Sequence, residues 1–286
     1  MPKRSLFRAL AFLPLAAVLS TGAARAAESA EAADPIQAIE RFQQALFDRI
    51  APSVVLISAK GKFGSGFFVN ADGLVLTNAH VVGDSASVEV VLHDGKRLAG
   101  AVVERGQKDV DLALVQVAAK SPTPLALQMQ GLRVGSWVAA VGHGLGGIWT
   151  FSTGMVTNIY PIGAERPVFQ TQIPLNPGAS GGPIVDRLGR VVGITTAGIP
   201  SANNVNFGIR IDVAPQVLSQ LADECCLVVL VPADVPLFVD GKMVGKGPRV
   251  VLPAEARAYE VSAVIGGQLR REEVSFPAQR RLDWSK

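Results

Sequence analysis

The spacing of apolar residues predicts an amphipathic helix ahead of any strand. Between residues 36 and 50 the apolar positions recur with the period of one helix face. They are Ile36, Ile39, Phe42, Leu46 and Ile50. Asp34 stands at the N-cap position, and Pro35 suits the first turn, where its missing N–H needs no partner. We therefore expect a short N-terminal helix over 35–50.

From Pro52 to about Ile211 the apolar residues form short Val- and Ile-rich runs separated by turn residues. Asp72-Gly73 and Asp94-Gly95 are typical of hairpin turns. The runs that we predict as strands include 53–58, 66–70, 74–77, 88–92 and 112–117. Because no long helical pattern interrupts them, the main domain is predicted to be mainly β.

The composition changes near residue 224. A short helix is expected over 214–221, and Val-rich strands follow at 227–231 and 237–239, with a turn at Asp240-Gly241. Residues 223–286 are therefore predicted to form a separate small β-sandwich domain.

Charge is unevenly placed, and this changes how the net charge of +3 should be interpreted. Four basic residues lie within the first 26 residues, which contain no acidic residue; without them the chain has 23 basic against 24 acidic residues. Basic Lys3 and Arg4, an apolar stretch over 9–19 and the small-residue pattern Ala24-Arg25-Ala26 are typical of a signal peptide. We expect 1–26 to be a signal peptide and 27–34 a linker, so the protein is predicted to be exported, to the periplasm or outside the cell.

The remaining charge gives no basic stripe for a phosphate backbone, so nucleic acid is not expected as a partner.

The two cysteines, Cys225 and Cys226, are adjacent in sequence. Adjacent cysteines seldom bridge each other, so we interpret them as apolar strand residues rather than as a redox pair.

One serine stands in a turn that is dense with glycine, at 176–183 (NPGASGGP). Glycine allows positive φ and close backbone approach, so the amides of Gly178 and Ser180 could point together as an oxyanion hole. A serine hydroxyl is a weak nucleophile and needs a base held by a carboxylate. Ser180 is therefore the candidate nucleophile.

The base must be one of three histidines. His80 follows an apolar strand, whereas His93 adjoins a turn and His143 lies in a glycine run, so His80 is the best placed. Asp111 opens the apolar run 112–115 and could face the ring, although Asp109, two residues earlier, remains a rival. The three histidines are too scattered for a metal site, and no metal is expected.

The segment 142–147 (GHGLGG) formally matches the dinucleotide fingerprint G-x-G-x-x-G. The residues after it show no helical pattern that would offer a pyrophosphate a helix N-terminus. We interpret it as a loop between strands and expect no cofactor.

Four motifs in order, GSGFFV (64–69), TNAHVV (77–82), DLALV (111–115) and NPGASGGP (176–183), resemble the HtrA/Deg peptidases. The resemblance covers roughly residues 38–222 and implies two six-stranded antiparallel β-barrels, the chymotrypsin fold, over 35–222. It also implies that His80, Asp111 and Ser180 form a catalytic triad. Ala179 stands where that family usually has asparagine, and this leaves the backbone amides available.

The same resemblance implies the substrate-binding residues. Pro174, Gly198 and Asn206 would lie near the primary specificity pocket, and 195–198, which are Thr195, Thr196, Ala197 and Gly198, would pair with the substrate backbone. None of these residues is acidic, so cleavage after small or medium apolar residues is expected.

The C-terminal domain is too short for the PDZ domains that follow in that family. Residues 231–248 are instead similar to the PEGA β-domain, which implies an interaction module with an envelope component as its expected partner. The resemblance also makes a homo-oligomer an expectation. The sequence thus predicts an exported serine endopeptidase acting on unfolded or extended polypeptides; the alternative is a catalytically weak or inactive protein of the same fold that acts as a peptide-binding chaperone or envelope scaffold.

Overall fold

The computed structural model describes residues 34–107, 110–120, 122–144, 148–160, 167–198 and 205–286. The chain divides into two units, Met1–Ala45 and Leu46–Lys286. The predicted signal peptide lies outside the described residues, as does the linker except for Asp34. Within the described residues no helix is long and apolar enough to cross a membrane.

Helix α2 (Pro35–Ile50) begins as the sequence predicts. The carboxylate of Asp34 accepts a hydrogen bond from the backbone N–H of Ile36 at 3.0 Å, and this satisfies one of the first free N–H groups of the helix. Leu46 and Ile50, in the last turn, are buried.

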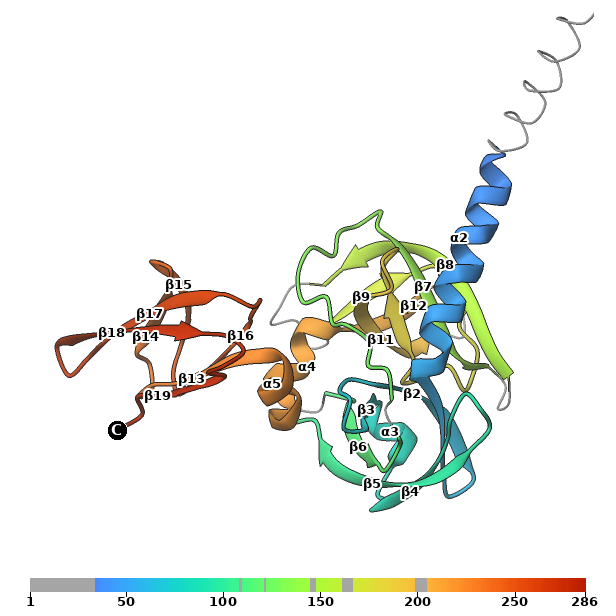
Figure 1. The fold of residues 1–286 in the computed structure, drawn as a ribbon, viewed down its shortest axis with the longest axis horizontal. Coiled ribbons are helices and arrows are strands. Elements are labelled where there is room, and N and C mark those ends of the chain that lie inside the picture. The colour runs from blue at the N-terminus through green and yellow to red at the C-terminus, as the bar shows by residue number, and fades with distance from the viewer. Residues whose placement is uncertain (1–33, 108–109, 121, 145–147, 161–166, 199–204) are drawn as a thin grey trace, which may run out of the picture. The chain divides into compact units, whose positions relative to one another are not determined.

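The first barrel contains six antiparallel strands that close in the order β1-β2-β3-β6-β5-β4 (Figure 1). Their bounds are β1 Val54–Ala59, β2 Lys62–Phe68, β3 Leu74–Thr77, β4 Ser87–Val91, β5 Arg97–Arg105 and β6 Ala113–Val117. A four-residue helix, α3 (Ala79–Val82), follows β3. Leu56 pairs with Ser65 across β1 and β2, and Thr77 pairs with Gly66 across β3 and β2.

The second barrel also closes from six antiparallel strands, in the order β10-β11-β12-β9-β8-β7. Their bounds are β7 Trp137–Gly144, β8 Ile148–Ile159, β9 Val168–Thr171, β10 Pro183–Val185, β11 Val191–Gly198 and β12 Asn206–Arg210. β7 and β8 pair as antiparallel neighbours from Trp137↔Met155 to Gly144↔Ile148. The segment 142–147 is therefore bounded by a strand pair and not by the strand–helix unit that a dinucleotide site needs.

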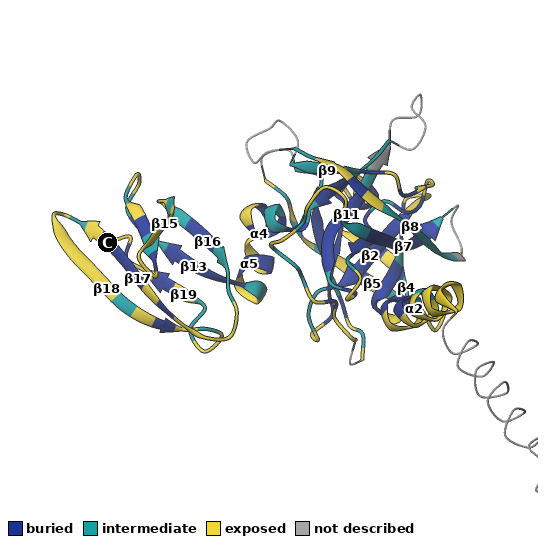
Figure 2. Cartoon of the chain, turned by 90° about the horizontal axis from the view of Figure 1, so that it is seen from above, coloured by how far each residue is buried: buried dark blue, intermediate teal, exposed yellow. Residues whose placement is uncertain are grey.

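Each barrel has its own apolar interior, and a further cluster joins the two. That cluster takes Leu74 and Leu76 from the first barrel and Val141 and Ile194 from the second. Figure 2 shows the barrel strands as predominantly buried. Burial of apolar side chains stabilises a fold by about 25 cal/mol per Å² removed from water. The seam between the barrels is therefore part of the core.

After β12 come three short helical segments and then the C-terminal strands. The segments are η2 Ile211–Val213, α4 Ala214–Val217 and α5 Ser219–Cys225, and a short 3-10 helix, η1 Ala51–Ser53, precedes β1. The single helix expected over 214–221 is thus two helices, because the backbone of Leu218 is extended and interrupts it.

The C-terminal strands form two sheets, of order β16-β13-β19 and β15-β14-β17-β18. Their bounds are β13 Cys226–Leu230, β14 Pro236–Val239, β15 Lys242–Lys246, β16 Arg249–Pro253, β17 Ala258–Ile265, β18 Gln268–Ser275 and β19 Arg281–Asp283. One apolar cluster takes Val229 from the first sheet and Leu237 and Val261 from the second. Two sheets that share a core are a β-sandwich. The predicted fold class, two six-stranded barrels with further β structure, is confirmed; the likeness to the PEGA domain stays a prediction.

Candidate active site

His80 and Asp111 meet at the edge of the first barrel. The sequence places His80 at the end of an apolar strand; in the structure it lies in α3, directly after β3. Asp111 comes two residues before β6, which pairs with β3 from Thr77↔Ala113 to Leu74↔Gln116. Because β3 and β6 are neighbours, the residues that flank the paired ends are brought together.

The carboxylate of Asp111 holds His80 at two points. Its Oδ2 lies 2.6 Å from the ring Nδ1 of His80, and its Oδ1 accepts the backbone N–H of the same residue at 2.8 Å. The side chain of Asn78 donates to the backbone carbonyl of Asp111 at 2.8 Å. The His80 side chain remains 52% exposed and that of Asp111 33% exposed, so the ring is accessible. Asp109, the rival carboxylate, lies outside the described residues.

The loop that carries Ser180 connects β9 to β10 and is held by three backbone hydrogen bonds. The N–H of Ala179 donates to Asn176 O, that of Gly181 to Thr195 O and that of Gly182 to Ala179 O. Among the described residues neither the N–H of Gly178 nor that of Ser180 donates a hydrogen bond. Gly178 has φ +99°, a conformation that glycine adopts readily. Two N–H groups without partners on one turn, here separated by Ala179, are what an oxyanion hole requires.

The loop of Ser180 packs against the segment that leads to His80. A Cβ atom built on Gly181 would lie 2.4 Å from the Thr77 hydroxyl and 3.1 Å from the backbone nitrogen of Asn78. Only glycine, with φ +84° here, allows so close an approach. Within the described residues the Ser180 hydroxyl and the His80 ring make no hydrogen bond to each other. Such bonds are often long in unliganded enzymes and tighten when substrate binds.

His143 is buried beside this loop and does not contact His80 through any hydrogen bond. Burial, and secondarily the nearby His93, lower the pKa of His143 to about 4. Its ring packs edge-on against Trp149 with centroids 4.3 Å apart, and a Cβ on Gly178 would lie 2.1 Å from its backbone oxygen. His143 is therefore neutral at pH 7. Its backbone packs closely against the loop that carries Ser180.

The predicted substrate strand lies next to the nucleophile loop. Thr195 exchanges two backbone hydrogen bonds with that loop, accepting from Gly181 and donating to Gly182. β10 pairs with β11 only between Val185↔Val191 and Pro183↔Ile194, so it does not continue alongside Thr196 to Gly198.

The other residues predicted to bind substrate are distributed around the same loop. Asn206 pairs with Gly198 across β12 and β11, and its side-chain N–H donates to the carbonyl of Ile173 at 2.8 Å. Pro174 is the next residue along the chain and is exposed. Ala197 and Gly198 are described by their backbone only. The structure therefore brings the predicted pocket residues to the side of the loop where β11 and β12 meet.

Sequence reasoning missed one residue that contacts the loop through both its side chain and its backbone. Ser65, in β2, is fully buried, and its hydroxyl donates to the carbonyl of Gly178 at 2.8 Å. Its backbone N–H donates to the carbonyl of Ser180 at 2.7 Å. The only signal in the sequence was a serine between two glycines, Gly64 and Gly66, in a motif that we used for recognition alone.

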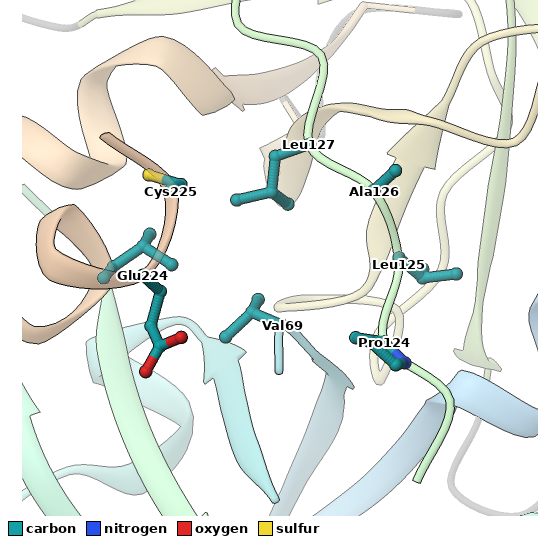
Figure 3. Close-up of a pocket in the computed structure, with 8 residues that line it drawn as sticks. Val69, Pro124, Leu125, Ala126, Leu127, Glu224 and Cys225 are labelled. Atoms are coloured by element: carbon teal, nitrogen blue, oxygen red, sulfur yellow. The ribbon is translucent and has the colours of Figure 1, made fainter. Parts of the chain in front are cut away.

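A cavity of about 310 Å³ lies elsewhere, between the segment 124–127 and helix α5 (Figure 3). Its lining residues are Val69, Pro124, Leu125, Ala126, Leu127, Leu221, Glu224 and Cys225. None of them is a predicted catalytic or substrate-binding residue. In the described part of the chain no three His, Cys, Asp or Glu side chains are close enough to hold a metal ion, and Cys225 and Cys226 are unbridged.

The structure has two closed six-stranded barrels, with a His–Asp pair at the edge of one and a glycine-rich serine loop on the other. This arrangement resembles that of the trypsin-like serine peptidases. Residues 64–194 match the family model described as a trypsin-like peptidase domain. A periplasmic serine endoprotease of Pseudomonas fluorescens, described as DegP-like, is 38% identical over 165 residues, which are 55% of this chain and 34% of the relative. The Do-like protease 14 of Arabidopsis thaliana is 34% identical over 260 residues, 82% of this chain and 55% of that protein.

Solved structures agree with the fold. The active form of the Rv3671c protease from M. tuberculosis is 26% identical, with a TM-score of 0.57 over 66% of this chain and 87% of that chain. The serine endoprotease of Yersinia pestis is 21% identical, with a TM-score of 0.57 over 82% of this chain and 96% of that chain, and it shows the fold alone. The chain spans about a third of the length of the Pseudomonas relative and just over half of the length of the Arabidopsis relative. Residues 64–194 are thus similar to trypsin-like peptidase domains, and the relatives of the chain include proteases described as DegP-like.

Proposed function

We propose that this protein is a serine endopeptidase that hydrolyses peptide bonds of unfolded or extended polypeptides through an acyl-enzyme. The observation that carries the proposal is the pair of hydrogen bonds that Asp111 accepts from the ring and from the backbone N–H of His80. Beside it lies a loop with two N–H groups that have no partner among the described residues. A bond to the ring alone could belong to an ordinary surface pair. A carboxylate that fixes both the ring and its backbone is an orienting device for a base.

In the proposed reaction the Ser180 hydroxyl attacks the carbonyl carbon of the scissile peptide, and His80 takes the hydroxyl proton. Asp111 keeps the proton of the ring on Nδ1, so that Nε2 is free to accept the serine proton and to pass it to the leaving amine. The C–N bond then breaks and leaves an ester on Ser180. Water, deprotonated by the same histidine, releases the acyl group.

The N–H groups of Gly178 and Ser180 are proposed to bind the oxyanion that forms at each attack. Loss of one such donor costs on the order of 100-fold to 1000-fold in kcat. Ala179, which separates them, is buried and contributes its N–H to the loop rather than to substrate. Its methyl side chain therefore leaves the two donors unobstructed.

An extended substrate is proposed to pair with β11 over Thr195 to Gly198. The N–H of Thr195 already donates to Gly182, and the edge of β11 that faces β10 is open only beyond it. Neither Pro174 nor Asn206, the other predicted pocket residues, is charged, so an apolar side chain before the scissile bond is favoured. Main-chain pairing gives affinity for any extended chain, which suits unfolded proteins. The specificity pocket, which holds the side chain before the scissile bond, then selects among cleavage sites.

Export to the periplasm is proposed from the basic and apolar pattern of 1–26, with support from relatives named as periplasmic endoproteases. A homo-oligomer and an envelope partner for the C-terminal sandwich remain predictions.

The test compares the purified protein with its Ser180→Ala variant on casein, an unfolded substrate, together with labelling by a serine-directed fluorophosphonate. We expect cleavage and labelling by the wild type only. If neither protein cleaves casein and the wild type is not labelled, Ser180 is not activated, and a peptide-binding role for the same fold would replace the proposal.

A further inference from the structure

Ser65 is the residue of β2 whose polar atoms are all engaged at the seam between the barrels. Its N–H donates to Ser180 O at 2.7 Å, and its carbonyl accepts the Thr77 hydroxyl at 2.6 Å. Its hydroxyl donates to Gly178 O at 2.8 Å and accepts the backbone N–H of His143 at 2.9 Å. One small side chain thus links the first barrel to the nucleophile loop and to β7.

The hydroxyl contacts a particular peptide of that loop. The peptide between Gly178 and Ala179 offers its carbonyl to Ser65 and its N–H to Asn176, at 2.8 and 3.0 Å. Because a peptide unit is planar, holding both of its polar ends fixes the orientation of its plane. The two neighbouring peptides, which carry the N–H groups of Gly178 and Ser180, each share a Cα atom with it, so its orientation restricts theirs.

The neighbours of Ser65 leave room for little else. A Cβ built on Gly142 would lie 3.0 Å from the Ser65 hydroxyl, and one built on Gly182 would lie 3.3 Å from Ser65 Cβ. Without the hydroxyl, the buried carbonyl of Gly178 would lose its side-chain donor, and a buried acceptor without a donor is costly. The loop could then regain a partner only by rotating the clamped peptide.

We infer that Ser65 is a positioning residue for the oxyanion hole: its hydroxyl clamps the central peptide of the nucleophile loop and thereby aims the N–H groups of Gly178 and Ser180. The inference rests on the proposed function, since it assigns a task within that reaction. Ser65 does not touch substrate. Its effect reaches the reaction through the direction of two other residues' N–H groups.

The test is steady-state kinetics of Ser65→Ala on a fluorogenic peptide that the wild type cleaves. We expect kcat to fall by about 10-fold to 100-fold. This decrease in kcat is no larger than the decrease that follows removal of an oxyanion-hole donor itself. KM should stay within about twofold, because ground-state binding on β11 is untouched. The pH profile of kcat/KM should keep its midpoint while its plateau drops, since His80 and Asp111 keep their contacts.

Ser53→Ala is the matched control. Ser53 is likewise a fully buried serine of the same part of the fold, but its hydroxyl has no hydrogen-bond partner among the described residues. The control should retain wild-type kcat. Thermal unfolding of both variants shows whether each is folded. If Ser65→Ala does not fold, Ser65→Cys decides, because its thiol is similar in shape and a weaker donor, and an intermediate kcat is expected.

Equal kcat for Ser65→Ala and Ser53→Ala would overturn the role of Ser65 and leave the proposed peptidase intact. Where Ser65→Ala does not fold, a folded Ser65→Cys with wild-type kcat would lead to the same conclusion. A rise in KM with unchanged kcat would also overturn it, since that would indicate a role in substrate binding. Absence of Ser180-dependent cleavage by the wild type would overturn the peptidase itself, and the inference with it.

Discussion

Replacing Asp111 by asparagine is the sharpest test of how the His80 base is oriented. The two oxygens of Asp111 accept from a backbone N–H at 2.8 Å and from the ring Nδ1 at 2.6 Å. An asparagine of the same shape has one oxygen and one NH₂ group. The backbone N–H of His80 cannot change from donor to acceptor, so it keeps the oxygen, and the NH₂ group faces the ring.

The imidazole can respond only by changing tautomer. With an NH₂ donor opposite Nδ1, the ring presents its lone pair there and carries its proton on Nε2, where it cannot accept the proton of Ser180. In triads of this kind the change costs about 10⁴-fold in kcat, which is roughly 5 kcal/mol of transition-state stabilisation. We expect a loss of that order for Asp111→Asn, with KM within about twofold because no substrate contact is removed.

The assay is single-substrate kinetics with a fluorogenic peptide, supported by the rate of fluorophosphonate labelling, which should fall in parallel. Asp109→Asn is the matched control, because it changes the same chemical group two residues away. Its kcat should stay within about threefold of the wild type if Asp109 has no catalytic role. A loss below about 10-fold for Asp111→Asn, or a larger loss for Asp109→Asn, would refute the assignment of Asp111 as the orienting carboxylate.

Three further predictions concern stability, loop geometry and specificity. Burial lowers the pKa of His143 from 6.5 to about 4, so this side chain binds a proton more readily in the unfolded chain than in the folded one. The free energy of unfolding should therefore decline as pH falls from about 6.5 to about 4. The decline due to this group is about 3 kcal/mol, and urea titrations at the two pH values should show a smaller decline for His143→Gln. Gly181→Ala should abolish activity and lower the melting temperature, because its Cβ would lie 2.2 Å from Ser65 O at φ +84°; near-wild-type cleavage would mean that the loop adapts. A peptide library should be cut after small or medium apolar residues, and preferential cleavage after Arg or Lys would contradict the uncharged pocket.

Much of the fold was predictable because alternation and turn residues are local signals. β3 has the bounds that the sequence predicts, 74–77, and the hairpin glycines lie at positive φ, Gly73 at +89° and Gly95 at +84°. Helix α3 was not predicted, because its four residues continue an apolar run. β5 was missed as well, since a strand with mostly solvent-facing residues gives little hydrophobic pattern.

Motifs in the sequence predicted the triad candidates, but they did not predict the residue that holds the loop of Ser180 in place. The bond between Ser65 and Gly178 joins residues 113 positions apart, and nothing in a local pattern encodes such a partner. In β2 the residues from Gly64 to Phe68 are all buried, so the alternation of inner and outer faces is lost there. A strand at a seam between two barrels is covered on both faces, which makes its functional residue look like any other core position.

The division of the proposed site between the two barrels also has a consequence for when the protein becomes active. The proposed base and its carboxylate belong to the first barrel and the proposed nucleophile to the second, and the barrels meet at a seam filled by residues such as Leu76 and Val141. A chain in which only one barrel has formed has no assembled site. On the proposed function, proteolysis would therefore be delayed until both barrels have docked, and newly made copies would be protected from one another.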